Sequence, residues 1–142
     1  MVDWLDDVAR ELDEKNARLK KWALLRAQTY EALNTRVSRI LGEAASFLQQ
    51  KDSQSRRYQV VSLSQTYPES GWGIERDTGD SSRKIFSLWI GGSSANPEDG
   101  RVYLSAERAT WSHTEKVEIP ASEYSDQWLK DQVHLAVRDD LI

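Results

Sequence analysis

The sequence contains no cysteine, which excludes disulfide bonds, thiolate metal sites and a cysteine nucleophile. This absence fits a protein of a reducing compartment, so we expect a cytoplasmic location. Only two histidines occur, His113 and His134, and neither has His, Asp or Glu neighbours at the spacing of a metal site. We therefore predict no metal site and no cofactor.

Long hydrophobic runs are also missing. No apolar segment approaches the ~20 residues that a membrane span needs. The N-terminus shows neither the basic nor the apolar segment of a secretory signal, so we expect neither a membrane protein nor a secreted one. The 142 residues correspond to one domain, or to a helical arm joined to one compact domain.

Proline and glycine are almost absent from the first third of the chain. Between Asp3 and Gln50 there is no proline and one glycine, Gly42, so we predict a single amphipathic helix over residues 1–51. Such a helix is about 70 Å long, which exceeds the width of a compact domain formed by residues 52–142. Part of the helix must therefore project or find a partner, and the polar segment 51–57 is predicted to join it to the domain.

Apolar residues recur along this helix at alternating spacings of three and four, as in the seam of a coiled coil. The first series is Leu5, Val8, Leu12, Leu19 and Trp22, with Lys15 at one seam position, and the second is Tyr30, Leu33, Val37, Ile40, Ala44 and Phe47. The offset of 25 residues is three heptads plus four, which predicts a stutter where the apolar face rotates. Alternatively, one half packs on its own domain and the other only resembles a heptad pattern.

Charge divides the same helix into two blocks. Residues 3–14 carry six acidic side chains against Arg10, a net charge of −5, and residues 15–26 carry five basic side chains and no acid. A parallel neighbour would place acid beside acid, whereas an antiparallel neighbour crossing near Glu14 places acid beside base. We therefore predict an antiparallel pair. The candidate interaction residues are Leu12, Leu19, Lys20, Lys21, Trp22, Tyr30 and Leu33.

The remainder of the chain alternates in the manner of a sheet. Strands are predicted at residues 58–67, 72–76, 84–90, 101–111 and 117–119, with a long loop at 91–100. A last helix follows, capped by Ser122 or Ser125. The order predicts an α+β fold: a long N-terminal helix, an antiparallel sheet of about five strands, and a C-terminal helix packed on the sheet.

Short motifs do not identify an enzyme. Asp77-Thr-Gly matches the tripeptide of aspartic proteases, but its polar surroundings favour a hairpin turn. The segment Gly91-Gly-Ser-Ser lacks the lysine of a phosphate loop and the pattern of a nucleophile elbow. Glu75 and Glu107 could act as an acid and a base only if the strand register brings them together. We name no catalytic residue.

These observations favour a non-enzymatic interaction or adaptor protein that forms a homodimer or docks a protein partner through its N-terminal helix. The alternative is a small-ligand-binding domain or minor enzyme with a pocket between helix and sheet, formed by Trp or Tyr faces. Nucleic-acid binding through the basic segment 15–26 is a third hypothesis. The net charge of −4, with ten basic against fifteen acidic residues from Asp52 onward, argues against it.

Overall fold

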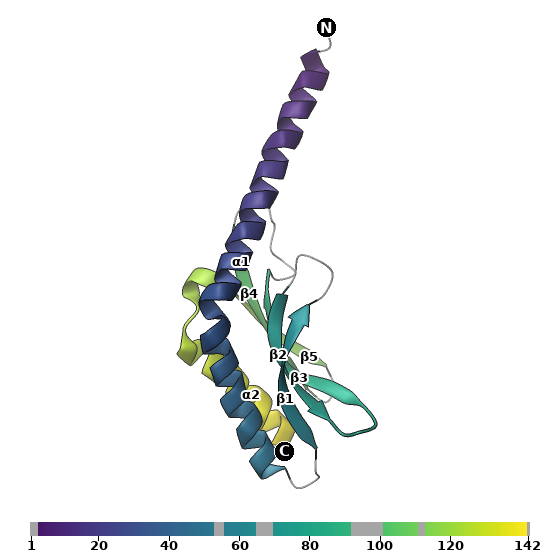
Figure 1. Cartoon of the computed structure of the whole chain (residues 1–142), viewed down its shortest axis with the longest axis vertical. Helices are drawn as coiled ribbons and strands as arrows, with labels where there is room; N and C mark the ends of the chain where they lie inside the picture. The colour runs from purple at the N-terminus through teal and green to yellow at the C-terminus, as the bar shows by residue number, and fades with distance from the viewer. Residues whose placement is uncertain (1–2, 53–55, 65–69, 92–100, 111–112, 142) are drawn as a thin grey trace.

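The computed structural model describes residues 3–52, 56–64, 70–91, 101–110 and 113–141. It contains a helix α1 (Asp3–Lys51), the strands β1 (Arg57–Ser64), β2 (Ser70–Asp77), β3 (Ser82–Ile90), β4 (Tyr103–Ala109) and β5 (Thr114–Pro120), a short 3-10 turn η2 (Ala121–Glu123) and a helix α2 (Asp126–Leu141). The predicted α+β fold is confirmed (Figure 1). The predicted strand residues 65–67 and 111, part of the predicted joint and the predicted loop from residue 92 onward lie outside the described residues.

The sheet is an antiparallel meander in the order β1-β2-β3-β4-β5. At the turn between β2 and β3, Gly79 has a φ of +91°, and its N–H donates to the Asp77 carboxylate at 2.7 Å. Asp77 therefore caps its own turn, and Asp77-Thr-Gly serves as a hairpin turn. A bulge opposite Ile74 lets two consecutive residues of β3, Ile85 and Phe86, both reach the core.

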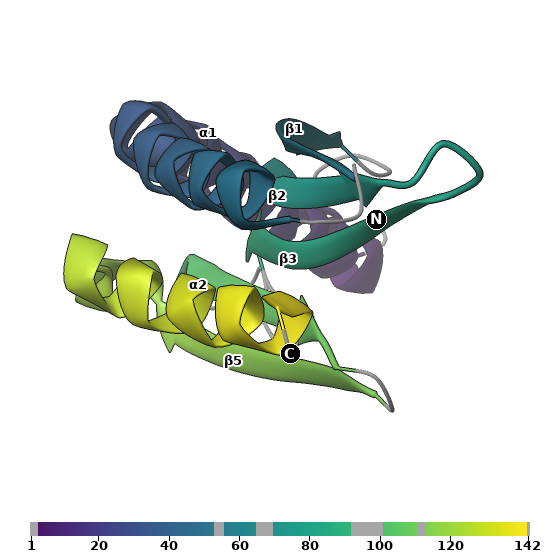
Figure 2. The ribbon, with the colours of Figure 1, turned by 90° about the horizontal axis from the view of Figure 1, so that it is seen from below.

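The two helices cover one face of the sheet. Figure 2 shows α1 and α2 side by side, with α1 contacting mainly β1 and β2, and α2 contacting β3 and β4. The N-terminus of α2 is capped by Ser125, whose Oγ accepts the Trp128 N–H at 3.0 Å, so the second of the two predicted caps is the one used.

The core joins the sheet to the C-terminal half of α1. Its fully buried side chains include Val37, Leu41, Leu48, Trp72, Ile74, Phe86, Leu88, Ile90, Leu104 and Leu129. Six buried residues of α1 between Leu33 and Leu48 belong to this cluster, so the segments 1–51 and 52–142 share one hydrophobic core. The half of the helix that follows Tyr30 therefore packs on its own domain.

The heptad assignment of this second half is wrong at its end. Phe47 is 44% exposed, while Leu41, Ala45 and Leu48, which lie outside the predicted seam, are buried. An α-helix that packs on one sheet without supercoiling repeats every 3.6 residues, so its buried face drifts away from a strict heptad. The same periodicity shows that the predicted rotation of the apolar face does not occur. Because 25 residues are close to seven full turns, the first and the second apolar series lie on the same face of α1.

Candidate interaction surface

The N-terminal part of α1 extends beyond the sheet as a free helix, which we call the arm (residues 3–21; Figure 1). Every residue from Asp3 to Arg18 is exposed, and the first buried side chain is Trp22. A helix of nineteen residues is about 28 Å long, so the arm is comparable in length to a small domain. The arm continues the packed half of α1, so its helix extends from turns that are already formed. It therefore does not bear the free-energy cost of nucleating a new helix.

One side of the arm carries an apolar stripe. Trp4, Leu5, Val8 and Leu12 are exposed by 66%, 46%, 43% and 54%. At about 100° per residue these four side chains fall within an arc of about 100°. The arc is the one that Leu33 and other core residues occupy farther along α1, so the stripe continues the buried face past the end of the sheet.

The arm ends at an anchor formed by Trp22 and Arg26. The Trp22 indole N–H donates to the Arg101 carbonyl oxygen at 2.7 Å, and the Arg26 guanidinium lies 4.5 Å from the centre of the indole ring. Both side chains are buried, at 7% and 5% exposure. They pack beside Gly91, whose φ of +117° favours glycine. The anchor fixes α1 to the end of the sheet.

The predicted interaction residues separate into two groups. Leu12, Lys20 and Lys21 lie exposed on the arm, and Leu19 lies half-buried at its base. The other three pack against the chain's own domain: Trp22 in the anchor, Leu33 in the core, and Tyr30 stacked on Trp72 with ring centroids 4.8 Å apart. Of the seven predicted interaction residues, only those on the arm are therefore left exposed.

Both charge blocks are displayed on the arm, but the basic one is shorter than the sequence suggested. The acidic residues of segment 3–14 are exposed, as are the four basic residues between Lys15 and Lys21. Arg26, the fifth basic residue, is buried against the Trp22 ring. Exposed ion pairs such as Asp7 with Arg10, at 2.6 Å, contribute at most about 1 kcal/mol each, so the blocks act mainly on orientation.

A second feature is a cleft of about 680 Å³ at the end of the molecule where the helices finish. It is lined by α2 on one side and by β2, β3 and the β4-β5 turn on the other, through Arg56, Arg76, Arg83, Ile85, Ala109, Thr110, His113, Ala136, Asp139 and Asp140. The cleft lies between helix and sheet, as the alternative hypothesis supposed. Its described lining includes three arginines and no Trp or Tyr ring.

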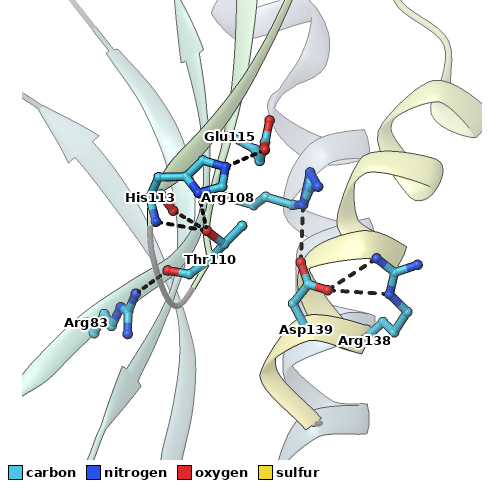
Figure 3. A network of polar contacts seen from close by, with 7 residues as sticks. All are labelled: Arg83, Arg108, Thr110, His113, Glu115, Arg138 and Asp139. Atoms are coloured by element: carbon cyan, nitrogen blue, oxygen red, sulfur yellow. Dashed lines mark hydrogen bonds and ion pairs between the residues drawn. The ribbon is translucent and has the colours of Figure 1, made fainter.

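Ion pairs connect the walls of this cleft. Figure 3 shows Arg108 and Arg138 pointing at Asp139, with separations of 3.3 and 3.2 Å. His113 lies on the neighbouring turn, with its Nε2 at 2.6 Å from the Glu115 carboxylate, and this contact lowers the pKa of Glu115. Both members of that pair are largely exposed, which is typical of a surface ion pair rather than a catalytic one.

The carboxylates considered for acid–base chemistry lie on the sheet face away from the helices. Glu75 and Glu107 both line a groove of about 570 Å³ there. In the strand register Glu75 lies opposite Lys84, and Glu107 lies opposite Ser87 and Lys116, so neither carboxylate faces the other. This arrangement provides no acid–base pair.

Metal-binding clusters and membrane-spanning helices are both absent from the part of the chain that the structure describes. The described part of the chain holds no cluster of three or more His, Asp or Glu side chains that could bind a metal ion. Within the same residues, no helix combines the length and the apolar content needed to cross a membrane. Comparison with known protein families, curated proteins and solved structures finds no match to this chain.

The arginines of the cleft are the residues that sequence reasoning missed. They come from the two strands β2 and β3 and from the segment before β1, and only the strand register and the packing of α2 bring them together. The one available signal was alternation: Arg76 stands two residues after Ile74, so both side chains point toward the helices. Nothing in the sequence indicated how the end of α2 meets this face.

Proposed function

We propose that this protein is a non-enzymatic interaction protein whose arm pairs with the arm of a second copy in antiparallel orientation. The observation that carries the proposal is the exposed apolar stripe of Trp4, Leu5, Val8 and Leu12 on a helix that projects from a folded domain. Contiguous exposed apolar surface of this kind marks an interaction site. None of the residues that the structure describes covers this stripe.

The folded domain sets the centre of the pair. Because Trp22 and Arg26 are buried, a partner helix can run alongside α1 only as far as about Lys21. Two arms that overlap over residues 3–21 cross at Leu12, so Leu5 of one copy faces Leu19 of the other. The crossing point moves from Glu14, the position that charge alone suggested, to Leu12.

Charge favours this orientation over the parallel one. In an antiparallel pair centred on Leu12, Asp3, Asp6 and Asp7 lie beside the basic residues 15–21 of the partner, while Glu11, Asp13 and Glu14 of the two copies lie near one another. A parallel pair sets every acidic and basic residue beside its own copy, so the antiparallel pair has the smaller repulsion. Interactions between exposed charges are screened over ~8 Å at physiological ionic strength, so charge selects the orientation and the apolar stripe supplies most of the free energy of association.

The test compares two substitutions to the same residue on opposite sides of the arm. Leu12→Gln removes apolar contact at the centre of the pair in both copies, which costs about 3 kcal/mol or more, equivalent to about a hundredfold in Kd. Ala17→Gln lies on the side away from the stripe and is the matched control. Light scattering after size exclusion should show a dimer for the original protein and Ala17→Gln, and a monomer for Leu12→Gln.

Two outcomes would contradict the proposal. The original protein could remain a monomer at high micromolar concentration, in which case the stripe does not cause self-association. Alternatively, both variants could dimerise as well as the original protein, which would place the interface elsewhere. Circular dichroism of both variants confirms that the helix and the sheet stay folded.

A further inference from the structure

The cleft at the end of α2 gathers positive charge in a protein whose net charge is −4. Arg56, Arg76 and Arg83 line it, and Arg108 and Arg138 contact Asp139 in its wall. Among the described residues, Asp52, Asp139 and Asp140 pair with four of these five guanidinium groups, and Glu115 lies close enough to Arg108 to interact with it electrostatically. The five arginines therefore exceed these four carboxylates by one charge, which gives the cleft an attraction for anions.

Buried carboxylates hold two of the lining arginines in place. The side chain of Asp52 is fully buried, and its carboxylate accepts a hydrogen bond from Nε of Arg56 at 2.8 Å. Asp140, with 4% of its side chain exposed, is paired with Nη1 of Arg76 and also accepts the Tyr58 hydroxyl at 2.7 Å. Because the two guanidinium groups are oriented before any ligand arrives, a ligand would not have to order them.

Most of the donors on these arginines are still available. A guanidinium group carries five N–H donors. Among the described residues, Arg83 donates only to the Thr110 carbonyl oxygen, at 3.2 Å, and Figure 3 shows it reaching toward that turn. The buried Nε of Arg76 finds no acceptor in the described part of the chain. A buried donor without an acceptor is unfavourable, and an oxygen-rich ligand would supply the missing acceptors.

We propose that this cleft binds a phosphate monoester, with Arg56, Arg76 and Arg83 as its ligands. A phosphate monoester carries close to two negative charges, and its three terminal oxygens can accept from several guanidinium groups at once. A carboxylate offers one charge and two oxygens. The volume of about 680 Å³ fits a small ligand, and the few apolar lining residues, Ile85, Ala109 and Ala136, favour a polar one.

The same phosphate chemistry has two possible sources, a soluble phosphate ester or the headgroup of a lipid. Calorimetric titration with glycerol 3-phosphate examines the first, with glycerol as the uncharged control. Flotation with phosphatidylcholine vesicles that contain phosphatidic acid examines the second, with pure phosphatidylcholine vesicles as the control. Binding to either phosphate probe, and to neither control, supports the site and identifies the source.

Matched arginine variants locate the binding. Arg83→Gln removes an exposed lining guanidinium whose one hydrogen bond within the described residues is to Thr110, so the fold should survive. Arg57→Gln removes the same charge from an exposed position of β1 outside the lining. We expect Arg83→Gln to weaken phosphate binding by about tenfold or more and Arg57→Gln by less than about twofold.

Two results would overturn the proposal. One is the absence of binding to both phosphate probes by the original protein, which would leave the arginines as a purely structural ion-pair network. The other is equal weakening by Arg83→Gln and Arg57→Gln, which would mean that the anion responds to general surface charge. Neither result depends on whether the arms associate.

Discussion

Replacing Trp22 with alanine should destabilise the protein more than the same replacement at Trp4, although both tryptophans lie on one helix. The Trp22 side chain is 7% exposed, and a buried indole removes about 150–250 Å² from water. At about 25 cal/mol per Å² this burial is worth about 4–6 kcal/mol, and allowing for a compact unfolded chain lowers the figure to about 3–5 kcal/mol. At a protein concentration low enough to keep the chain monomeric, Trp4→Ala should cost less than about 0.5 kcal/mol, because this side chain is 66% exposed.

Urea unfolding provides the measurement. With a denaturant slope of about 1.5 kcal/mol per molar, a loss of about 4 kcal/mol lowers the midpoint of Trp22→Ala by about 2–3 M. Trp22→Phe keeps most of the ring but loses the hydrogen bond to the Arg101 carbonyl oxygen, so it should lose only about 1–2 kcal/mol. The order of stability is therefore the original protein, then the phenylalanine variant, then the alanine variant.

Protein concentration separates the anchor from an interface. An intrachain anchor gives a loss of stability that is the same at low and high protein concentration, because no association is involved. A loss that grows with concentration would instead mean that Trp22 contacts a partner. Equal midpoints for Trp22→Ala and Trp4→Ala would refute the reasoning, since they would show that the indole of Trp22 is not buried in solution.

Three further results are expected. Lys20→Glu combined with Lys21→Glu should weaken association at low salt and much less at high salt, as sedimentation at two ionic strengths would show. Gly71→Ala should destabilise the protein by about 3 kcal/mol or more, because the added Cβ meets a backbone carbonyl oxygen of β3. Gly42→Ala, in open space on α1, should instead stabilise it by about 0.5–1 kcal/mol, and thermal unfolding measures both changes. Burial, and then a hydrogen bond to the Asp140 carboxylate, raise the pKa of Tyr58. The contribution of Tyr58 to the free energy of unfolding is therefore complete below about pH 10, where the unfolded chain begins to ionise, and is lost progressively above it. Tyr58→Phe should make the alkaline decline in the urea midpoint shallower.

Local chemistry was enough to predict the order of elements. The scarcity of proline and glycine in the first fifty residues predicted α1, alternation predicted the strands, and Ser125 was one of two predicted caps for α2. These signals depend on neighbouring residues, which a sequence displays directly. The consecutive burial of Ile85 and Phe86 follows from a bulge that alternation does not predict.

The interaction surface was only partly predictable, because it depends on which part of α1 the domain covers. Spacing placed Leu12, Trp22 and Leu33 in equivalent positions, yet the structure exposes the first and buries the other two. The decisive factor is the position of the sheet along the helix, set by long-range contacts such as Trp22 with Arg101. The cleft was less predictable still, since its arginines meet only through the strand register and the docking of α2.

Disulfide cross-linking of the arms tests the central claim most directly. The chain has no cysteine, so introduced cysteines are its only thiols. In an antiparallel pair centred on Leu12, residues 5 and 19 of opposite copies are adjacent, while two copies of residue 5 lie about 21 Å apart along the axis. A disulfide requires Cα atoms within about 7 Å. We expect the Leu5→Cys and Leu19→Cys proteins to cross-link when mixed, and Leu5→Cys alone to remain uncross-linked. Efficient bridging of Leu5→Cys to itself would contradict the account, because it would show that the arms run parallel.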